Sequence, residues 1–216
     1  MTQVSAVPAC LQAHDLCCIR ADRLIFDALD FTARAGEVWQ VTGPNGAGKT
    51  SLLRLLAGLG APAGGTLHWC GEPLPQARDR YQSELLFLGH SPAVAGFLSA
   101  RENLLHACAL GDQSPRMPVT DALKRVGLPC VDEAPAQRLS AGQRQRLALA
   151  RFPLVPARLW IMDEPLTALD LAGRELVEAL LAEHAAAGGI AVVSTHQGLH
   201  LPRGVLRQFE LPGLPS

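Results

Sequence analysis

The sequence lacks a surplus of charge of either sign. Its 216 residues include 19 Lys and Arg against 20 Asp and Glu, which gives a formal net charge of −1. Proteins that work on nucleic acid usually carry a basic face, so we expect no nucleic-acid partner. Hydrophobic residues make up 48% of the chain and charged residues 18%. This composition excludes a disordered chain and favours a globular domain with a sizeable core.

Cysteine is present, but without the spacing that a metal site or a disulfide framework needs. The six cysteines are Cys10, Cys17, Cys18, Cys70, Cys108 and Cys130. No Cys-x-x-Cys pair occurs and no histidine is spaced for zinc, so the pattern suits a protein of the reducing cytosol. The adjacent Cys17 and Cys18 leave a redox role open, and we expect them to pack as small apolar side chains.

The sequence also lacks a segment that would carry the chain into or across a membrane. The first Lys or Arg is Arg20, so no charged region precedes an apolar stretch as it does in a secretory signal. The uncharged run from Leu55 to Leu67 is too short and too rich in glycine to span a bilayer. If the protein works at a membrane, we expect it to dock onto another protein that crosses it.

Strands and helices alternate at both ends of the chain. Predicted strands cover 24–31, 38–42, 66–70, 84–88, 159–162 and 190–194, and predicted helices cover 49–57 and 171–184. The middle of the chain, about 92–152, is predicted to be largely helical. No internal repeat and no linker composition appears, so we expect one domain over 1–216. Its class would be α/β, with a helical subdomain at about 92–155.

A glycine-rich loop joins the predicted strand at 38–42 to the predicted helix at 49–57. It matches Gly-x-x-x-x-Gly-Lys-Ser/Thr, the phosphate-binding loop that lies between a strand and a helix. The residues expected to bind the nucleotide here are Gly43, Pro44, Asn45, Gly46, Ala47, Gly48, Lys49, Thr50 and Ser51. Glycines let backbone N–H groups face a phosphate, Lys49 would reach the β- and γ-phosphates, and Thr50 would offer its hydroxyl to Mg²⁺. The alternative is a glycine-rich turn that caps an ordinary helix, for which the whole motif in this context would be a rare coincidence.

Two carboxylates end the apolar strand predicted at 159–162. Asp163 would lie beside the phosphate loop, where it can hold Mg²⁺ through water, and Glu164 can polarise or deprotonate the attacking water. A strand often ends in a charged residue where it reaches solvent, so one acidic side chain would be uninformative. Two in succession favour a catalytic role.

A third motif, Leu139-Ser-Ala-Gly-Gln143, opens another predicted helix. In its local context, Ser140 with Gln143 forms a capping box at the helix N-terminus. The same helix end can bind an anion through the Ser140 hydroxyl, the backbone N–H groups and the helix dipole. The two interpretations are compatible.

This third motif, placed shortly before the strand that ends in Asp-Glu, resembles the signature of the ATP-binding-cassette (ABC) ATPases. Leu166-Thr-Ala-Leu-Asp170 is similar to the D-loop of that family, and Thr195-His196 to its switch histidine. The resemblance covers nearly the whole chain. It implies a P-loop NTPase core with an antiparallel β subdomain and an inserted helical subdomain. It also implies a head-to-tail homodimer that holds ATP and Mg²⁺ between the phosphate loop of one copy and the signature of the other.

The resemblance assigns roles within that dimer. From the signature side, it assigns nucleotide binding to Ser140, Gly142, Gln143 and Asp170. Glu164 would be the catalytic base, and His196 would contact the γ-phosphate from the copy that holds the phosphate loop. A lone histidine after an apolar strand is otherwise more often a buried structural residue.

Whole segments resemble a narrower family, the ATP-binding subunits of the haem exporter of cytochrome c maturation. They are 36–58, 86–92 and 159–165. The resemblance implies integral membrane partners of the same maturation system and a peripheral place on the cytoplasmic side of the cell inner membrane. Whether haem itself is the cargo is not encoded in an ATPase subunit.

Two positions depart from the broader ABC pattern. His90 stands where a glutamine is usual, in a Leu-Gly-His sequence that the haem-exporter family shares. Its imidazole can approach Mg²⁺ or the attacking water, or it merely caps the strand before Ser91-Pro92. Arg20 aligns near the usual adenine-stacking aromatic residue. A guanidinium can also stack on a base, and an exposed surface arginine is the equally open alternative.

Three functions compete on these motifs. The first is an ATPase that powers a membrane transporter, and the second is a soluble ABC ATPase that acts on DNA, ribosomes or iron–sulfur assembly. Those that act on DNA or ribosomes typically need tandem cassettes, a long coiled coil or a basic face, none of which is visible in the sequence. The third, a nucleotide-binding scaffold or small kinase, has no need of the signature. The sequence therefore favours the transporter ATPase.

Overall fold

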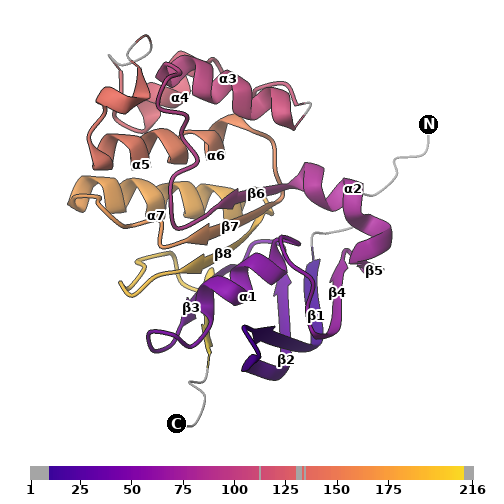
Figure 1. Cartoon of the computed structure of the whole chain (residues 1–216). Helices are drawn as coiled ribbons and strands as arrows, with labels where there is room; N and C mark the ends of the chain where they lie inside the picture. Colours follow the sequence, from indigo (N-terminus) through magenta and orange to yellow (C-terminus); the bar gives the residue numbers. More distant parts are fainter. Residues whose placement is uncertain (1–9, 112, 130–132, 134, 212–216) are drawn as a thin grey trace.

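The computed structural model describes residues 10–111, 113–129, 133 and 135–211 of the chain. Its strands are β1 (Cys10–Arg20), β2 (Arg23–Arg34), β3 (Val38–Thr42), β4 (Gly64–Trp69), β5 (Glu72–Pro73), β6 (Leu85–Leu88), β7 (Leu159–Asp163), β8 (Ile190–Ser194) and β9 (Leu206–Glu210). Its helices are α1 (Lys49–Leu56), α2 (Leu74–Glu84), α3 (Ala100–Leu110), α4 (Val119–Arg125), the 3-10 helix η1 (Ala136–Arg138), α5 (Ala141–Leu149), α6 (Arg151–Leu154) and α7 (Leu171–Ala186). The strands form two sheets (Figure 1).

A parallel sheet of five strands forms the middle of the molecule, in the order β6-β7-β8-β3-β9. Every residue of β7 and β8 is buried, as expected of parallel strands that are covered on both faces. Alternate side chains of β7 enter different cores: Trp160 and Met162 pack with α7, whereas Leu159 and Ile161 pack with α1. The two faces of this sheet are therefore covered by different parts of the chain.

The second sheet is antiparallel, in the order β2-β1-β4-β5, and it lies beside α1 (Figure 1). Its apolar face, with Leu11 and Trp69, shares one core with α1 and the near face of the parallel sheet. Register shifts interrupt the β1–β2 pairing between Ala13 and Ile19. Such bulges increase the local twist of a strand. The β1–β2 hairpin ends beside α1, where Arg20 contacts the first turn of that helix.

Helices α3 to α6 lie between β6 and β7 in the sequence and gather together on one side of the parallel sheet (Figure 1). A capping box of Ser99 and Glu102 starts α3. Leu104, Leu123 and Phe152 bury their side chains in the same core as α7. The signature helix α5 is therefore attached to the far face of the sheet from α1.

The α/β class is confirmed, and the predicted strands at 38–42, 159–162 and 190–194 each differ from the observed strand by at most one residue. Helix α1 ends one residue before the end predicted for it. Helix α7 ends at Ala186, two residues past its predicted end and shortly before Gly188, which has φ 81°. Within the segment predicted to be largely helical, the first helix begins only at Ala100. Strand β1, helix α2 and strand β9 were not predicted from the sequence.

Of the adjacent pair expected to pack as small apolar side chains, Cys18 is buried and Cys17 only partly so. Cys18 and Cys108 are buried, Cys10, Cys17 and Cys70 are partly buried, and all five are free thiols. Burial raises the pKa of the Cys18 and Cys108 thiols, so they stay protonated at neutral pH. Cys130 lies outside the described residues. Within the described part of the chain, no helix has the length and apolar content to cross a bilayer.

Candidate active site

The loops that follow four of the parallel strands meet at one cavity of about 400 Å³. These loops follow β3, β6, β7 and β8, whose carboxyl ends lie along the same edge because the strands are parallel. The cavity is lined by Arg20, Ile25, Asn45, Gly46, Gly48, Lys49, Thr50, Ser51, His90, Asp163, Glu164 and His196. The structure thus brings the phosphate loop and the acidic strand end together with both predicted histidines.

Two glycines fix the path of the phosphate loop. Gly43 has φ 139° and Gly48 has φ 98°, values that L side chains rarely adopt. A Cβ at Gly43 would lie 2.6 Å from the carbonyl oxygen of Leu211, and a Cβ at Gly48 would lie 2.3 Å from Ile25 Cγ2. A side chain at either position would therefore clash with these neighbours and displace the loop from its position between β9 and the β1–β2 hairpin.

The loop and the first turn of α1 present positive charge and free donors. Lys49 is buried, and its Nζ donates to the carbonyl oxygens of Gly43 at 2.8 Å and of Pro44 at 3.0 Å. The N-cap of α1 is Gly48, and no side chain caps the helix, so its first N–H groups have no side-chain acceptor. This arrangement suits an anion such as a phosphate.

Asp163 ends β7 with its carboxylate almost wholly buried, at 2% exposure. Its Oδ2 accepts a hydrogen bond from Thr50 Oγ1 at 2.9 Å, and its Oδ1 accepts one from Ser194 Oγ at 2.5 Å. Hydroxyl and carboxylate oxygens are ligands that Mg²⁺ prefers, and this ion usually takes only one or two carboxylates, with phosphates and water for the rest. The pair of Thr50 and Asp163 therefore fits Mg²⁺.

Glu164 lies one residue beyond β7, with a left-handed φ of 52°. Its N–H donates to the Ser194 carbonyl oxygen at 3.0 Å and to Ser194 Oγ at 3.1 Å. Its Oε1 lies 3.5 Å from Nε2 of His196. Since this backbone conformation is unfavourable for a residue with a Cβ, the bonds to Ser194 hold Glu164 where the chain alone would not put it. Strain of this kind is common at functional sites.

His90 lies in the loop after β6 and lines the same cavity with an exposed side chain. Among the described residues we find no hydrogen bond or ion pair to its imidazole. A side chain that capped the strand would need such a bond to the backbone. The position therefore leaves the imidazole available to a ligand in the cavity.

The signature residues do not line this cavity. The predicted capping box is present: Ser140 Oγ accepts from the Gln143 N–H at 3.2 Å, and Gln143 Oε1 accepts from the Ser140 N–H at 2.9 Å. Gly142 is packed so closely against the D-loop that a Cβ would lie 2.9 Å from the Ala168 carbonyl oxygen. Predicted nucleotide-binding residues thus fall on two separate surfaces of one chain.

Asp170 joins the D-loop to the signature helix. Its Oδ1 accepts a hydrogen bond from the Gly173 N–H at 2.9 Å, which caps α7, and one from Arg146 Nη2 at 2.6 Å. The Gly173 N–H and the Arg146 guanidinium hold the pKa of Asp170 below its ordinary value. The Arg146–Asp170 contact therefore joins the start of α7 to α5, the helix that Ser140 caps, so Ser140, Gly142 and Asp170 lie on one connected surface.

Two polar residues that were not predicted from the sequence, Gln40 and Ser194, hold the site in place through hydrogen bonds. Gln40 on β3 is 4% exposed, and its Nε2 donates to the carbonyl oxygens of Gln197 at 2.9 Å and Thr195 at 3.4 Å. These bonds fix the backbone on both sides of His196. Ser194, at the end of β8, holds Asp163 and Glu164 as described above. The sequence signal that could have identified them is a polar residue within an apolar strand, as at Gln40, or at its end, as at Ser194.

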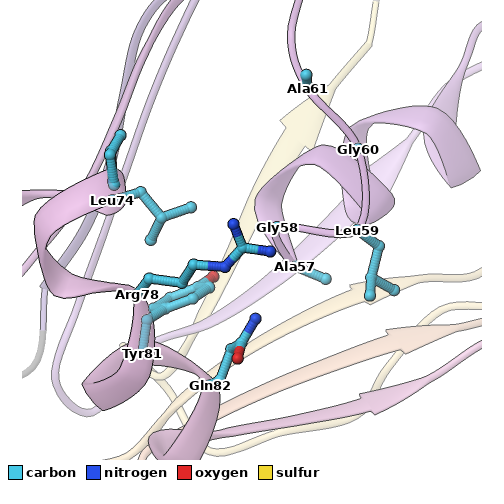
Figure 2. Close-up of a pocket in the computed structure, with 10 residues that line it drawn as sticks. Ala57, Gly58, Leu59, Gly60, Ala61, Leu74, Arg78, Tyr81 and Gln82 are labelled. Carbon is cyan, nitrogen blue, oxygen red and sulfur yellow. The ribbon is translucent and has the colours of Figure 1, made fainter.

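A larger cavity, of about 530 Å³, lies away from these residues, between the loop after α1 and helix α2. Figure 2 shows Arg78 and Gln82 of α2 reaching toward the loop with Gly58 and Leu59. The Tyr81 hydroxyl donates to the carbonyl oxygen of Leu56. None of the predicted site residues lines this cavity, so its size alone does not mark it as the place of chemistry.

Comparison with known proteins agrees with this geometry. Residues 26–167 match the family model described as ABC transporter. The chain is 47% identical to the cytochrome c biogenesis ATP-binding export protein CcmA 2 of Salmonella paratyphi A, over 94% of this chain and 97% of that protein. It is 44% identical to CcmA of Escherichia coli K12, over 93% of this chain and 96% of that protein. An ABC transporter ATP-binding protein of Pyrococcus furiosus, 24% identical, shares the fold with a TM-score of 0.79 over 94% of this chain and 97% of that one.

Proposed function

The chain belongs to the ABC transporter family of ATP-binding proteins, and from that premise we propose that it hydrolyses ATP to power an export transporter of cytochrome c biogenesis. The CcmA proteins that it resembles support the assignment over nearly their whole length. The chain would lie on the cytoplasmic face of the inner membrane, with integral membrane subunits of the transporter as partners and haem as the cargo.

The observation that carries the proposal is the cavity shared by Lys49, Thr50, Asp163, Glu164 and His196. A cation, a pair of Mg²⁺-type oxygen ligands, a carboxylate and an imidazole come there from separate loops of one sheet edge. These groups can supply what phosphoryl transfer to water needs: positive charge for the phosphates, ligands for Mg²⁺, and a residue that orients or deprotonates the attacking water.

Each group has a distinct task in that reaction. Lys49 and the N–H groups of α1 would bind the β- and γ-phosphates and stabilise the negative charge that develops there. Thr50 and Asp163 would hold Mg²⁺, which when bound neutralises charge on the same phosphates. Glu164 would accept the proton of the attacking water, and His196 would contact the γ-phosphate. His90 lies where it can orient the water.

The remaining predicted residues support a head-to-tail homodimer. Ser140, Gly142 and Asp170 form a surface that does not reach the cavity of their own chain. The anion-binding helix end on this surface serves ATP only if a second copy brings its phosphate loop against it. Each ATP would then lie between the phosphate loop of one copy and the signature of the other.

A groove beside the nucleotide cavity offers a place for the membrane subunits. It has a volume of about 390 Å³ and lies between β6 and α3, close to the loop that carries His90. Leu110 at its rim is 76% exposed, and Arg151 in its wall has an Nε with no hydrogen-bond partner among the described residues. A cytoplasmic segment of a membrane subunit with apolar side chains and one carboxylate would satisfy both features.

The test is purification of the tagged chain from its native membranes in mild detergent. We expect integral membrane proteins of cytochrome c biogenesis to co-purify with it, together with ATPase activity that requires Mg²⁺. Recovery of an active ATPase from the soluble fraction, with no membrane protein attached, would instead favour the soluble ABC ATPase.

A matched pair of variants ties that result to the groove. Leu110→Glu puts a charge on the groove rim and should release the membrane partners, whereas ATP binding should be unchanged. Leu24→Glu changes another exposed leucine, 42% exposed, on a strand that contributes nothing to the groove. If both variants lost the membrane partners to the same extent, the groove would not be the docking site of the membrane subunits.

A further inference from the structure

The backbone at Glu164 is held from one side by β8. Its left-handed φ of 52° is unfavourable for a residue with a Cβ and persists only where the surrounding structure restrains it. The bonds from its N–H to Ser194 restrain the backbone that precedes the Glu164 side chain. On the other side, its carbonyl oxygen accepts from the Thr167 N–H at 3.2 Å, which closes a local turn. A restraint from outside that turn is therefore expected at the next residue, Pro165.

Helix α5 supplies this restraint through Gln145. The side chain is buried at 6% exposure, and its Nε2 donates to the Pro165 carbonyl oxygen at 2.9 Å. Pro165 is buried and has no N–H of its own, and its ring fixes φ. Because the ring removes that freedom, a bond to its carbonyl oxygen also limits how the Glu164–Pro165 peptide can rotate. Glu164 is thus held by β8 before its side chain and by α5 after it.

Packing alone does not account for a glutamine at this place. The residues that share the buried face of α5 are apolar: Leu147, Ala148 and Leu149. Burying an amide is unfavourable unless it finds a partner, and a methionine would fill a similar volume without a polar group. Gln145 instead bonds to the backbone 20 positions further along the chain, directly beside the carboxylate that would accept the proton of the attacking water.

We propose that Gln145 is a positioning residue for Glu164 of its own chain, acting through the Pro165 carbonyl. This inference rests on the proposed function. Helix α5 would then serve two active sites: Ser140 at its N-terminus contacts the ATP of the partner, and Gln145, in its middle, sets the carboxylate of its own chain. Without the Gln145 bond, the backbone at Glu164 relaxes from its strained φ and the carboxylate moves away from the water.

The first test separates binding from turnover. Gln145→Met keeps a similar volume and loses the donor, so kcat should fall by about 10- to 100-fold, the effect of a misplaced catalytic group. The dissociation constant for ATP should stay within about twofold, because the phosphate loop is unchanged. Gln145→Glu puts an acceptor against the carbonyl oxygen and should lose more turnover. Leu147→Met, a change of similar size at a buried residue of the same helix, is the control and should keep kcat within about twofold.

Gel filtration gives a readout that does not depend on the rate. With MgATP, Gln145→Met should accumulate as a dimer, because its signature is intact and the nucleotide is consumed slowly. If the substitution instead damaged α5 as a whole, the variant would fail to dimerise with MgATP. That failure, or a loss of ATP affinity that matches the loss of turnover, would overturn the inference.

Mixed dimers show which chain Gln145 serves. A partner with Lys49→Ala leaves only the cavity of the Gln145→Met chain in use, so this mixture should stay slow. A partner with Ser140→Arg contributes its own intact cavity and uses the signature of the Gln145→Met chain, so an equal mixture should reach about a quarter of the wild-type rate. Recovery with the Lys49→Ala partner, or none with the Ser140→Arg partner, would overturn the inference and leave the ATPase assignment standing. A wild type without ATPase activity would overturn both.

Discussion

The two surfaces predicted to contact ATP are built in opposite ways. In the phosphate-loop cavity, Lys49 and Asp163 are buried and held by hydrogen bonds within the same chain. On the signature surface, Ser140 is exposed and the Asp170 side chain is 70% exposed, although both are anchored at helix ends. We therefore expect the first surface to bind nucleotide alone, whereas the second faces no cavity of its own chain. Hydrolysis, unlike nucleotide binding, should therefore depend on the association of two copies of the chain.

The largest effect is expected at the cavity. Glu164→Gln removes the proton acceptor but keeps a side chain of the same shape, so ATP binding should persist while the turnover rate falls by about 10²- to 10⁴-fold. With MgATP present, the variant should also accumulate as a dimer, because the bound nucleotide is no longer consumed. Gel filtration with and without MgATP measures this. A variant that binds ATP yet stays monomeric would contradict the proposed dimer.

A comparable loss of hydrolysis with a different cause is expected at the signature surface. Ser140→Arg places bulk and charge at the helix end that would face the partner's ATP in the proposed dimer. Hydrolysis should fall by about 100-fold or more, as when a group that stabilises the transition state is lost. Affinity for ATP in the isolated monomer should not change, because Ser140 is outside that cavity. Weakened binding by the monomer would show that the two surfaces are not separate.

The support beneath the cavity should matter less. Gln40→Leu leaves the carbonyl oxygens of Thr195 and Gln197 without their donor, so we expect a loss of about 1 to 3 kcal/mol in the free energy of unfolding. The turnover rate should fall by about tenfold because the backbone around His196 loosens, at a nearly constant affinity for ATP. Steady-state kinetics and urea unfolding measure the two effects. Gln12→Leu, on β1, is the control and should leave turnover unchanged.

The smallest effect is a titration on the signature surface. The Gly173 N–H and Arg146 lower the pKa of Asp170, so its contribution to stability is present above the ordinary aspartate pKa and is lost as the pH falls through the lowered value. An NMR titration of the Asp170 carboxyl carbon should show a midpoint below the ordinary value of about 3.9. Arg146→Ala should raise that midpoint only in part, since the Gly173 bond remains. If Arg146→Ala left the midpoint unchanged, the Arg146 guanidinium would not lower the pKa of Asp170, and this link between the D-loop and α5 would be absent.

The functional motifs of this chain could be predicted from the sequence more completely than the strands and helices that position them. The phosphate loop, the Asp163-Glu164 pair and the capping box of Ser140 are contiguous motifs, and their local geometry is a property of a few neighbouring residues. The strands at 159–163 and 190–194 were equally clear, because both faces of a buried parallel strand must be apolar.

What the sequence did not reveal depends on neighbours in space. The alternation of β1 is interrupted at Asp15, which has φ 50°, so its polar and apolar residues follow no single period. Strand β9 lies at the edge of the sheet and carries exposed side chains at Arg207 and Gln208, which weakens its apolar pattern. The ion pair of Arg146 with Asp170 joins residues 24 positions apart, a distance at which no local pattern operates.

If each chain supplies one half of each active site, two inactive variants that are damaged in different halves should complement each other. Lys49→Ala damages the cavity and Ser140→Arg damages the signature surface, so each homodimer should be inactive. A mixed dimer keeps one intact site, made from the cavity of one variant and the signature of the other. At equal concentrations, the mixture should recover about a quarter of the wild-type ATPase rate, since half of the dimers are mixed and each has one site of two. A mixture that never exceeds the mean of its two parents, at any ratio, would contradict the account.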